Sequence, residues 1–172
     1  HWIKAQEKIN LDGKLRIYKT HSGNYNLFGN DFTNKKNTFG VIYIVRDPRN
    51  IIASIANHYQ HDLKTSTDFL LEEQKLLFVT DPKDPKHNSE TNIVNLLGSW
   101  KNHYNSWKIS SNLIIIRYED LITDTKSEIN KLIIFLQKFG NFKTNNEKID
   151  NIIRTTSFEV LQKKEEKDGF NE

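Results

Sequence analysis

The hydrophobic positions of this chain form short apolar runs separated by stretches with helical spacing. Residues 41–45 and 113–116 are continuous apolar runs rich in β-branched side chains, as is typical of parallel strands covered on both faces. Amphipathic segments follow both runs. Strands that alternate with helices in this way predict an α/β fold with a central parallel sheet flanked by helices.

Helical spacing predicts helices at residues 3–9, 48–60, 69–78, 91–108, 125–140, 146–154 and 157–166. Thr125 and Glu128 have the spacing of a capping box at the start of one of them. A short strand is expected at residues 15–19, a mobile loop at residues 22–38, and a proline break at residues 81–85. No repeat or linker divides the 172 residues, which predicts a single domain.

The clearest amphipathic stripe lies in the helix predicted at residues 91–108. Its apolar members step by four, three, four and three residues: Ile93, Leu97, Trp100, Tyr104 and Trp107. His103 shares this face with Trp100 and Trp107. A histidine on an aromatic stripe is either a core residue or a residue that lines a pocket, and the sequence leaves both open.

The corner after residues 41–45 has the pattern of an anion site. Asp47 is placed as an N-cap and Pro48 as the first helical residue. Seven residues make nearly two helical turns, so Ser54 is expected on the same side as Asp47. Arg46 and Ser54 can then converge on a phosphate near the helix N-terminus. The alternative is that Arg46 pairs with a carboxylate.

Lys19 and His21 lie two residues apart at the end of a predicted strand, which places both on one face. Ligands of open parallel sheets collect beyond the carboxyl ends of the strands. A lysine there can neutralise a transferring group while a neutral histidine accepts a proton from a hydroxyl. The alternative is a surface lysine beside a structural histidine.

Composition narrows the classes of function. The formal net charge of +3 is too small to indicate nucleic-acid binding, and the absence of cysteine excludes disulfides and thiolate metal sites. No apolar run approaches the ~20 residues that span a bilayer, and no signal peptide is visible, so we expect no membrane contact and a cytoplasmic location. His58 and His61 lack a third ligand other than Asp62, so no metal is expected.

Five segments resemble motifs of the sulfotransferase family, in the family's order. Arg46, Asp47, Pro48 and Ser54 resemble its 3′-phosphate segment, Arg-(Asn/Asp)-Pro with a serine eight residues after the arginine. The other segments are Lys19-Thr20-His21, Gly98-Ser99-Trp100 with His103 and Trp107, Tyr118-Glu119-Asp120-Leu121, and Thr156-Ser157-Phe158. The resemblance covers residues 2–170, essentially the whole chain.

The resemblance implies a P-loop-NTPase-like layered fold that binds 3′-phosphoadenosine-5′-phosphosulfate (PAPS). The sulfuryl group passes to a hydroxyl or amine on a small molecule or glycan, and 3′,5′-adenosine bisphosphate (PAP) is the product. No metal takes part. The implied roles are 3′-phosphate binding for Arg46 and Ser54, adenosine binding for Tyr118, Thr156 and Phe158, catalysis for His21 as base with Lys19, and acceptor contact for His103.

The chain also departs from the family pattern. The family's Pro-Lys-Ser-Gly-Thr-Thr loop and its Arg-Lys-Gly segment do not occur here, so we expect a domain incomplete at both ends, with little turnover alone. Ser22 and Gly23 replace the usual Leu-Pro, and Asp47 replaces the commoner Asn. Two alternatives stay open. One is an inactive nucleotide-binding or interaction domain on the same fold. The other is a P-loop-type kinase, disfavoured because no Gly-x-x-x-x-Gly-Lys-(Ser/Thr) occurs.

Overall fold

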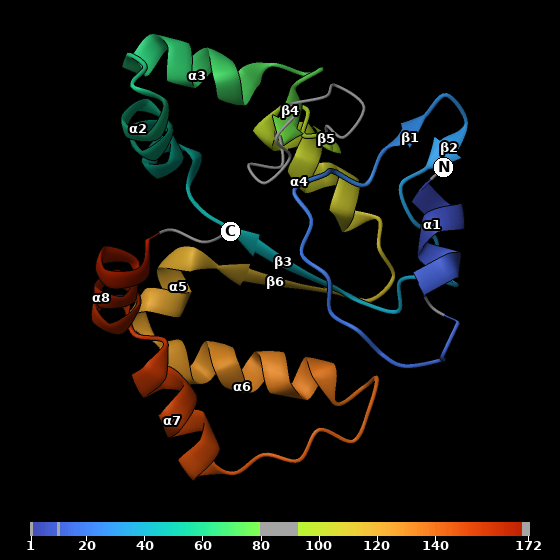
Figure 1. Cartoon of the computed structure of the whole chain (residues 1–172), viewed down its shortest axis with the longest axis vertical. Coiled ribbons are helices and arrows are strands. Elements are labelled where there is room, and N and C mark those ends of the chain that lie inside the picture. The colour runs from blue at the N-terminus through green and yellow to red at the C-terminus, as the bar shows by residue number, and fades with distance from the viewer. Residues whose placement is uncertain (1, 10, 80–92, 170–172) are drawn as a thin grey trace. The chain divides into compact units, whose positions relative to one another are not determined.

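The computed structural model of the chain describes residues 2–9, 11–79 and 93–169. The chain forms two compact units, His1–Ile115 and Ile116–Glu172 (Figure 1). Each unit has its own helices and its own packed side chains. The expectation of a single domain stays a prediction.

The first unit contains most of the strands. Its elements are α1 (Trp2–Ile9), β1 (Asn26–Leu27), β2 (Asn30–Asp31), β3 (Val41–Val45), α2 (Pro48–Tyr59), α3 (Leu63–Leu71), β4 (Leu76–Val79), β5 (Ile93–Leu96) and α4 (Trp100–Lys108). Strand β6 (Leu113–Arg117) begins in this unit and ends in the second. The second unit continues with α5 (Tyr118–Thr123), α6 (Thr125–Leu136), α7 (Asn146–Thr155) and α8 (Phe158–Asp168).

Strand pairing confirms the predicted α/β class. β3 pairs with β6, and Figure 1 shows the two strands running in the same direction. The Val41 N–H donates to the Asn112 carbonyl at 2.8 Å where the pair begins. β1 with β2 and β4 with β5 form antiparallel pairs, the second with Leu76 opposite Leu96. A parallel pair whose strands both lead into helices is the arrangement expected from the alternating pattern.

The corner between β3 and α2 forms as its sequence predicts. The Asp47 side chain caps α2 by accepting from the Arg49 N–H at 2.9 Å, and Pro48 is the first helical residue. Proline suits this position because its fixed φ matches the helix and its missing N–H would have had no helical partner. The helix ends at Tyr59, and its C-cap Gln60 adopts the left-handed conformation with φ 55°.

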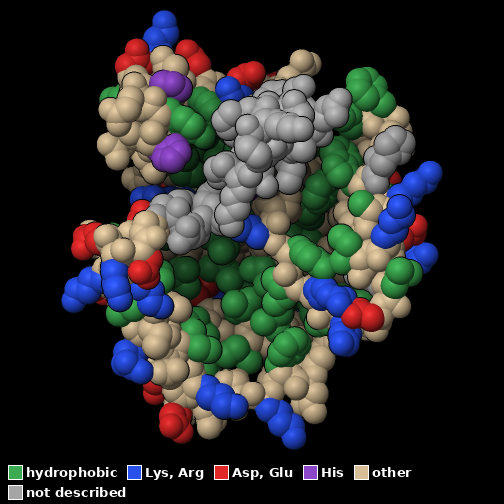
Figure 2. All heavy atoms as spheres, viewed as in Figure 1, with side chains coloured by type: hydrophobic (Ala, Val, Ile, Leu, Met, Phe, Trp, Pro, Cys, Tyr) green, Lys and Arg blue, Asp and Glu red, His purple; other side chains and the backbone are tan. Residues whose placement is uncertain are grey.

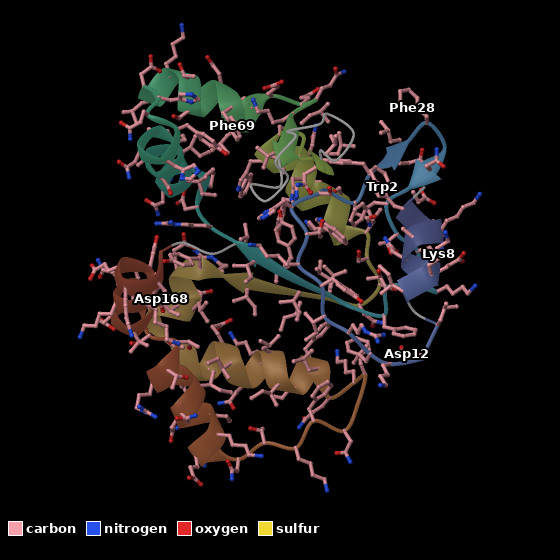
Figure 3. All side chains as sticks on the ribbon, viewed as in Figure 1. Trp2, Lys8, Asp12, Phe28, Phe69 and Asp168 are labelled. Carbon is pink, nitrogen blue, oxygen red and sulfur yellow. The ribbon has the colours of Figure 1, made fainter. Side chains whose placement is uncertain are left out.

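Aromatic side chains build the core of the first unit. Trp107 of α4 is only 6% exposed and lies 5.8 Å from the ring of Phe32, which in turn lies 5.4 Å from Trp2 of α1. Elsewhere in the unit α2 packs on α3, where Tyr59 meets Phe69 at 5.8 Å. Figure 3 labels Trp2 and Phe69, and it shows Phe28 at the tip of the β1–β2 hairpin. These edge-to-face and tilted pairs are favourable ring geometries.

The second unit packs around buried side chains of β6, α6 and α7. Ile116, Phe135 and Ile149 are each at most 6% exposed. Other large apolar side chains of this unit reach solvent, including Ile122 at 62% and Phe158 at 70% exposure. Figure 2, where hydrophobic side chains are green, shows that apolar side chains reach the visible surface of the chain. Phe158 is itself a predicted adenosine ligand, so the exposure of its side chain leaves it accessible to a nucleotide.

The strand predicted at residues 15–19 does not form. Residues 13–21 have no regular secondary structure, and none of the described strands pairs with them. Leu15, Ile17 and Tyr18 are 44%, 68% and 61% exposed. Alternating apolar residues make a strand only when a neighbouring strand supplies the ladder of hydrogen bonds. The period-two argument for placing Lys19 and His21 on one face therefore fails.

Two predicted helices are wrong over part of their length. The helix expected at residues 69–78 stops at Leu71, and Leu76–Val79 is instead β4. Residues 93–96 of the helix expected at 91–108 form β5, because pairing with β4 outweighs the local helical spacing. Helix α4 begins at Trp100, after Gly98 with φ 63° and the N-cap Ser99. The proline break predicted at residues 81–85 lies outside the described residues.

Smaller differences concern caps and loops. Asp124, not Thr125, is the N-cap of α6 and accepts from the Ser127 N–H at 3.2 Å. The predicted capping box is therefore wrong, since Thr125 is already helical and Glu128 is buried and paired with Lys131. Helix α6 ends at Leu136 rather than near residue 140. The loop predicted at residues 22–38 contains the β1–β2 hairpin.

Candidate functional site

The β3–α2 corner positions the two residues predicted to bind a phosphate. Arg46 is the first residue after β3 and is half-buried. Ser54 is the seventh residue of α2 and is exposed. A rise of 1.5 Å per residue puts Ser54 about 9 Å along the helix axis from Pro48. Arg46 therefore lies at the end of the strand, and Ser54 lies on the helix that follows it.

The charge of Asp47 is partly compensated within this corner. Arg49 donates from Nε to Oδ1 at 3.0 Å and from Nη2 to Oδ2 at 2.5 Å, while its backbone N–H also donates to Oδ1. This pairing raises the pKa of Arg49. An aspartate at a helix N-terminus would repel a phosphate, but the guanidinium on the same carboxylate reduces that repulsion.

The main chain that follows His21 is fixed although the His21 side chain is exposed. The Gly23 N–H donates to the Leu96 carbonyl at 2.8 Å, and the Asn24 N–H donates to Ser106 Oγ at 2.9 Å. Trp107 Nε1 donates to the Ser22 carbonyl at 3.2 Å. Ser22 itself is only 3% exposed. Strand β5 and helix α4 therefore hold the segment at residues 22–24.

His103 of α4 contacts this segment and the sheet at the same time. Its Nε2 lies 3.1 Å from the His21 carbonyl oxygen, and its Nδ1 lies 2.8 Å from the Tyr43 hydroxyl. Burial lowers the pKa of His103, which favours the neutral ring. Burial also raises the pKa of Tyr43 to about 12, so its hydroxyl keeps its proton. Both ring nitrogens of His103 thus face protein groups.

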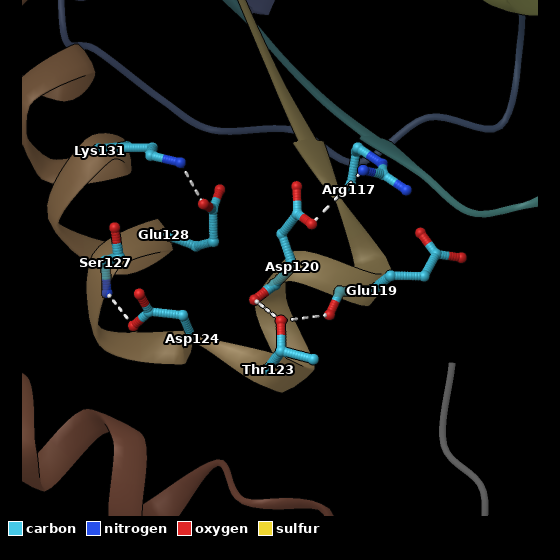
Figure 4. A network of polar contacts seen from close by, with 8 residues as sticks. All are labelled: Arg117, Glu119, Asp120, Thr123, Asp124, Ser127, Glu128 and Lys131. Carbon is cyan, nitrogen blue, oxygen red and sulfur yellow. Dashed lines mark hydrogen bonds and ion pairs between the residues drawn. The ribbon is translucent and has the colours of Figure 1, made fainter.

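Tyr118 begins α5 directly after β6, and Figure 4 draws polar contacts of the residues around it in sequence. Arg117 and Asp120 form an ion pair at 3.6 Å. The Thr123 hydroxyl donates to the Glu119 and Asp120 carbonyls at 3.0 and 3.3 Å. Glu119 and Asp120 lie in the first turn of α5, where carboxylates stabilise a helix. The contacts of this corner are those of a helix start.

Thr156 and Phe158 lie at the junction of α7 and α8. Thr156 is the C-cap of α7, and its hydroxyl donates to the Ile152 carbonyl at 2.7 Å. Ser157 is the N-cap of α8, and Phe158 is its first residue. The Phe158 ring is 70% exposed. It is therefore accessible for stacking on a flat ligand.

The predicted site residues divide between the two units. The first unit holds Lys19, His21, Arg46, Ser54 and His103, and the second holds Tyr118, Thr156 and Phe158. Within the first unit His103 touches the backbone of His21 directly. The roles of the eight residues as base, lysine partner of the base, acceptor contact and nucleotide ligands stay predictions.

Sequence reasoning missed the residues that support His21. Tyr43 hydrogen-bonds His103, while Ser106 and Trp107 bind the chain at residues 22–24. The sequence did contain an indication for Tyr43, because it is the single aromatic residue of an otherwise aliphatic strand. A phenol in such a strand needs a hydrogen-bond partner when it is buried. The partner itself comes from a distant helix and could not be identified from spacing.

No cluster of three or more metal-ligating side chains occurs within residues 2–9, 11–79 and 93–169. His58 and His61 instead contact the ring of Tyr59, at 4.6 and 5.7 Å between centroids. None of the helices formed by the described part of the chain has the length and apolar character needed to span a membrane.

Comparison with known proteins identifies the family. A family model described as sulfotransferase domain matches residues 2–168. The chain is 29% identical to a 3-beta-hydroxysteroid sulfotransferase of Cavia porcellus over 170 residues, which cover 95% of the chain and 53% of that protein. It is 28% identical to a luciferin sulfotransferase of Photinus pyralis over 158 residues, which cover 88% of the chain and 36% of that protein.

A solved structure supports the same fold. The crystal structure of mouse sulfotransferase SULT7A1 complexed with PAP matches 72% of this chain and 39% of its own, with a TM-score of 0.52 and 22% identity. The chain spans about half the length of the hydroxysteroid relative that it matches. With the family model matched across residues 2–168, the chain belongs to the sulfotransferase family.

Proposed function

We propose that this chain belongs to an enzyme that transfers a sulfuryl group from PAPS to a hydroxyl or amine acceptor. The observation that carries the proposal is the β3–α2 corner. It presents Arg46 directly after the strand and Ser54 on the helix that Asp47 and Pro48 begin. Membership of the sulfotransferase family supports the same reading of the corner.

The corner suits the 3′-phosphate of the donor. Arg46 supplies a guanidinium, which binds phosphate through charge-assisted hydrogen bonds. Ser54 supplies a hydroxyl, and the N-terminus of α2 favours negative charge. Arg49 reduces the repulsion that the Asp47 carboxylate would exert on the phosphate. These groups together explain why a dianion would bind here in preference to an uncharged ribose.

The adenosine part of the donor is assigned to three residues of the second unit. Tyr118 begins α5, and Thr156 and Phe158 flank the turn between α7 and α8. The exposed Phe158 ring offers a flat apolar surface, on which a purine can stack. Thr156 and Tyr118 add hydroxyl groups that can hydrogen-bond the base or the sugar.

The transfer needs a base and a positive charge. His21 would accept the proton of the acceptor hydroxyl as the acceptor oxygen bonds to sulfur. The bond between sulfur and the 5′-phosphate oxygen breaks at the same time, and PAP leaves with that electron pair. Lys19 would offset the charge on the transferring group. Both side chains are exposed, so an acceptor can approach them.

The acceptor is proposed to be a small molecule or glycan with a hydroxyl or amine. The relatives that the chain resembles are named for hydroxysteroids and luciferin, and a further one is an amine sulfotransferase of Oryctolagus cuniculus, 28% identical over 132 residues. The family resemblance gives His103 a place in the acceptor pocket. Its two ring nitrogens already face Tyr43 and His21, so its contact with an acceptor would be through the ring edge.

Calorimetry with PAP and with ATP, each titrated into the natural full-length protein, tests this function. We expect PAP to bind more tightly than ATP. A preference for ATP would favour the kinase alternative, and no binding of either would favour an interaction domain. Replacement of His21 by Ala should lower the rate of sulfuryl transfer by roughly 10²–10⁴-fold while PAP still binds. An unchanged rate would exclude His21 as the base.

A further inference from the structure

The environment of His103 fixes the position of its proton. Its Nε2 faces the carbonyl oxygen of His21 at 3.1 Å, and a carbonyl can only accept a hydrogen bond. Nε2 therefore carries the proton and donates. Nδ1 is then the unprotonated nitrogen and accepts from the Tyr43 hydroxyl, which lies 2.8 Å away. The result is a directed chain of hydrogen bonds from the strand β3 through helix α4 to the backbone of His21.

The packing of His103 keeps this chain neutral. Burial lowers the pKa of the imidazole and raises that of the Tyr43 phenol, so neither group is charged near neutral pH. The two rings lie 5.7 Å apart, and the Tyr104 ring lies 5.8 Å from Tyr43. Aromatic contacts therefore restrict the rotation of Tyr43, and its hydroxyl restricts the rotation of His103.

The carbonyl that His103 binds belongs to the residue proposed as the base. The next residues are held by the same helix, since Trp107 donates to the Ser22 carbonyl and Ser106 accepts from the Asn24 N–H. Residues 13–21 have no strand partner among the described residues, so the chain next to His21 is held by contacts with α4 and β5.

We propose that Tyr43 and His103 are positioning residues that hold the main chain of His21, so that its imidazole is presented correctly to the acceptor. This inference rests on the proposed function, because it assigns the base role to His21. It does not require His103 to touch either substrate. Since the His21 carbonyl sets the tautomer of His103 and the Tyr43 hydroxyl then donates to its other ring nitrogen, the two residues act as one unit.

Nuclear magnetic resonance of the natural full-length protein with ¹⁵N-labelled histidine tests the hydrogen-bond chain directly. We expect His103 to be protonated at Nε2 and unprotonated at Nδ1. Tyr43→Phe should shift the Nδ1 resonance and the amide signal of Ser22, which shares a peptide group with the His21 carbonyl. Tyr104→Phe is the matched control, and it should change neither. A proton on Nδ1, or a Ser22 signal unmoved by Tyr43→Phe, would overturn the proposal.

Steady-state kinetics gives a second test that depends on turnover. Tyr43→Phe should lower kcat about fivefold to tenfold, the effect of one lost hydrogen bond, and leave the KM for PAPS unchanged. His103→Gln keeps an N–H at the position of Nε2 and should retain more activity than His103→Leu. Equal activities of the Gln and Leu variants would contradict a positioning role. If wild-type protein binds no PAP and shows no turnover, the proposed function fails. The resonance test still decides whether Tyr43, His103 and the His21 carbonyl are hydrogen-bonded as described.

Discussion

At the scale of single residues, the ion pair of Asp47 and Arg49 affects the charge that surrounds a phosphate bound at the β3–α2 corner. The Arg49 guanidinium donates to both carboxylate oxygens of Asp47, and the Arg49 side chain is 87% exposed. An exposed ion pair is weak and sensitive to salt. Its value here would lie in lowering the negative charge beside the bound phosphate.

Arg49→Gln should therefore weaken PAP binding by about twofold to fivefold at low salt, with a smaller effect at high salt. Calorimetry at two salt concentrations measures this. Arg16→Gln is the control, because Arg16 makes a similar pair with Asp12 in another segment, at 2.5 Å. Unchanged or tighter binding by the Arg49 variant would show that the pair does not tune the site.

His103 predicts a pH dependence of stability. Burial lowers the pKa of His103 from the ordinary value of 6.5, and the charge of the nearby His21 lowers it further. Tyr43 stays neutral. Above 6.5 the ring is neutral in both the folded and the unfolded chain. Below pH 6.5 the imidazole of the unfolded chain is protonated at a higher pH than that of the folded chain. The free energy of unfolding therefore falls as the pH falls toward the pKa of the folded state.

Urea unfolding from about pH 5 to about pH 8 checks this expectation, with His103→Gln as reference. The wild-type protein should lose more stability than the variant as the pH falls below the ordinary histidine pKa. Parallel pH profiles for the two proteins would contradict a half-buried, neutral His103.

At the scale of elements, the start of α4 depends on Gly98. Its φ of 63° lies in the left-handed region, and a Cβ there would overlap the Tyr25 hydroxyl. That hydroxyl donates to the Leu97 carbonyl at 2.9 Å. Glycine is therefore required both by its backbone conformation and by the close approach of Tyr25.

Gly98→Ala should lower the free energy of unfolding by about 1–3 kcal/mol, since strained φ and overlap add. Gly13→Ala is a matched control, because Gly13 has φ 67° but no neighbouring atom within 4 Å of the position that a Cβ would take. The midpoint of urea unfolding should fall further for the Gly98 variant. Equal shifts in the two variants would show that only backbone strain matters.

The elements that the sequence predicts well are those with local causes. Asp47 and Pro48 define the start of α2 through their own backbone and side-chain preferences. The predictions for residues 15–19 and 93–96 are wrong because their state depends on whether a distant strand pairs with them. Likewise, the support of His21 by α4 involves residues about 80 positions apart, which no local pattern reveals.

At the scale of the whole molecule, the proposed nucleotide ligands come from both compact units. Arg46 and Ser54 belong to the first unit, and Thr156 and Phe158 to the second. Addition of PAP should slow amide hydrogen exchange around residues 46–54 if Arg46 and Ser54 bind it, and around residues 156–158 if Thr156 and Phe158 bind it. Mass spectrometry of the natural full-length protein with and without PAP measures this. Unchanged exchange around residues 156–158 would contradict the roles proposed for Thr156 and Phe158.

Arg46 is proposed to bind the 3′-phosphate of the donor, and two nucleotides that differ in this phosphate test the assignment. Affinities of wild-type protein and Arg46→Ala for PAP and for 5′-AMP, which lacks that phosphate, are measured by calorimetry. We expect the variant to lose ~1.5–3 kcal/mol of PAP binding per lost charged hydrogen bond, with 5′-AMP affinity nearly unchanged. An equal loss for both nucleotides would contradict the assignment.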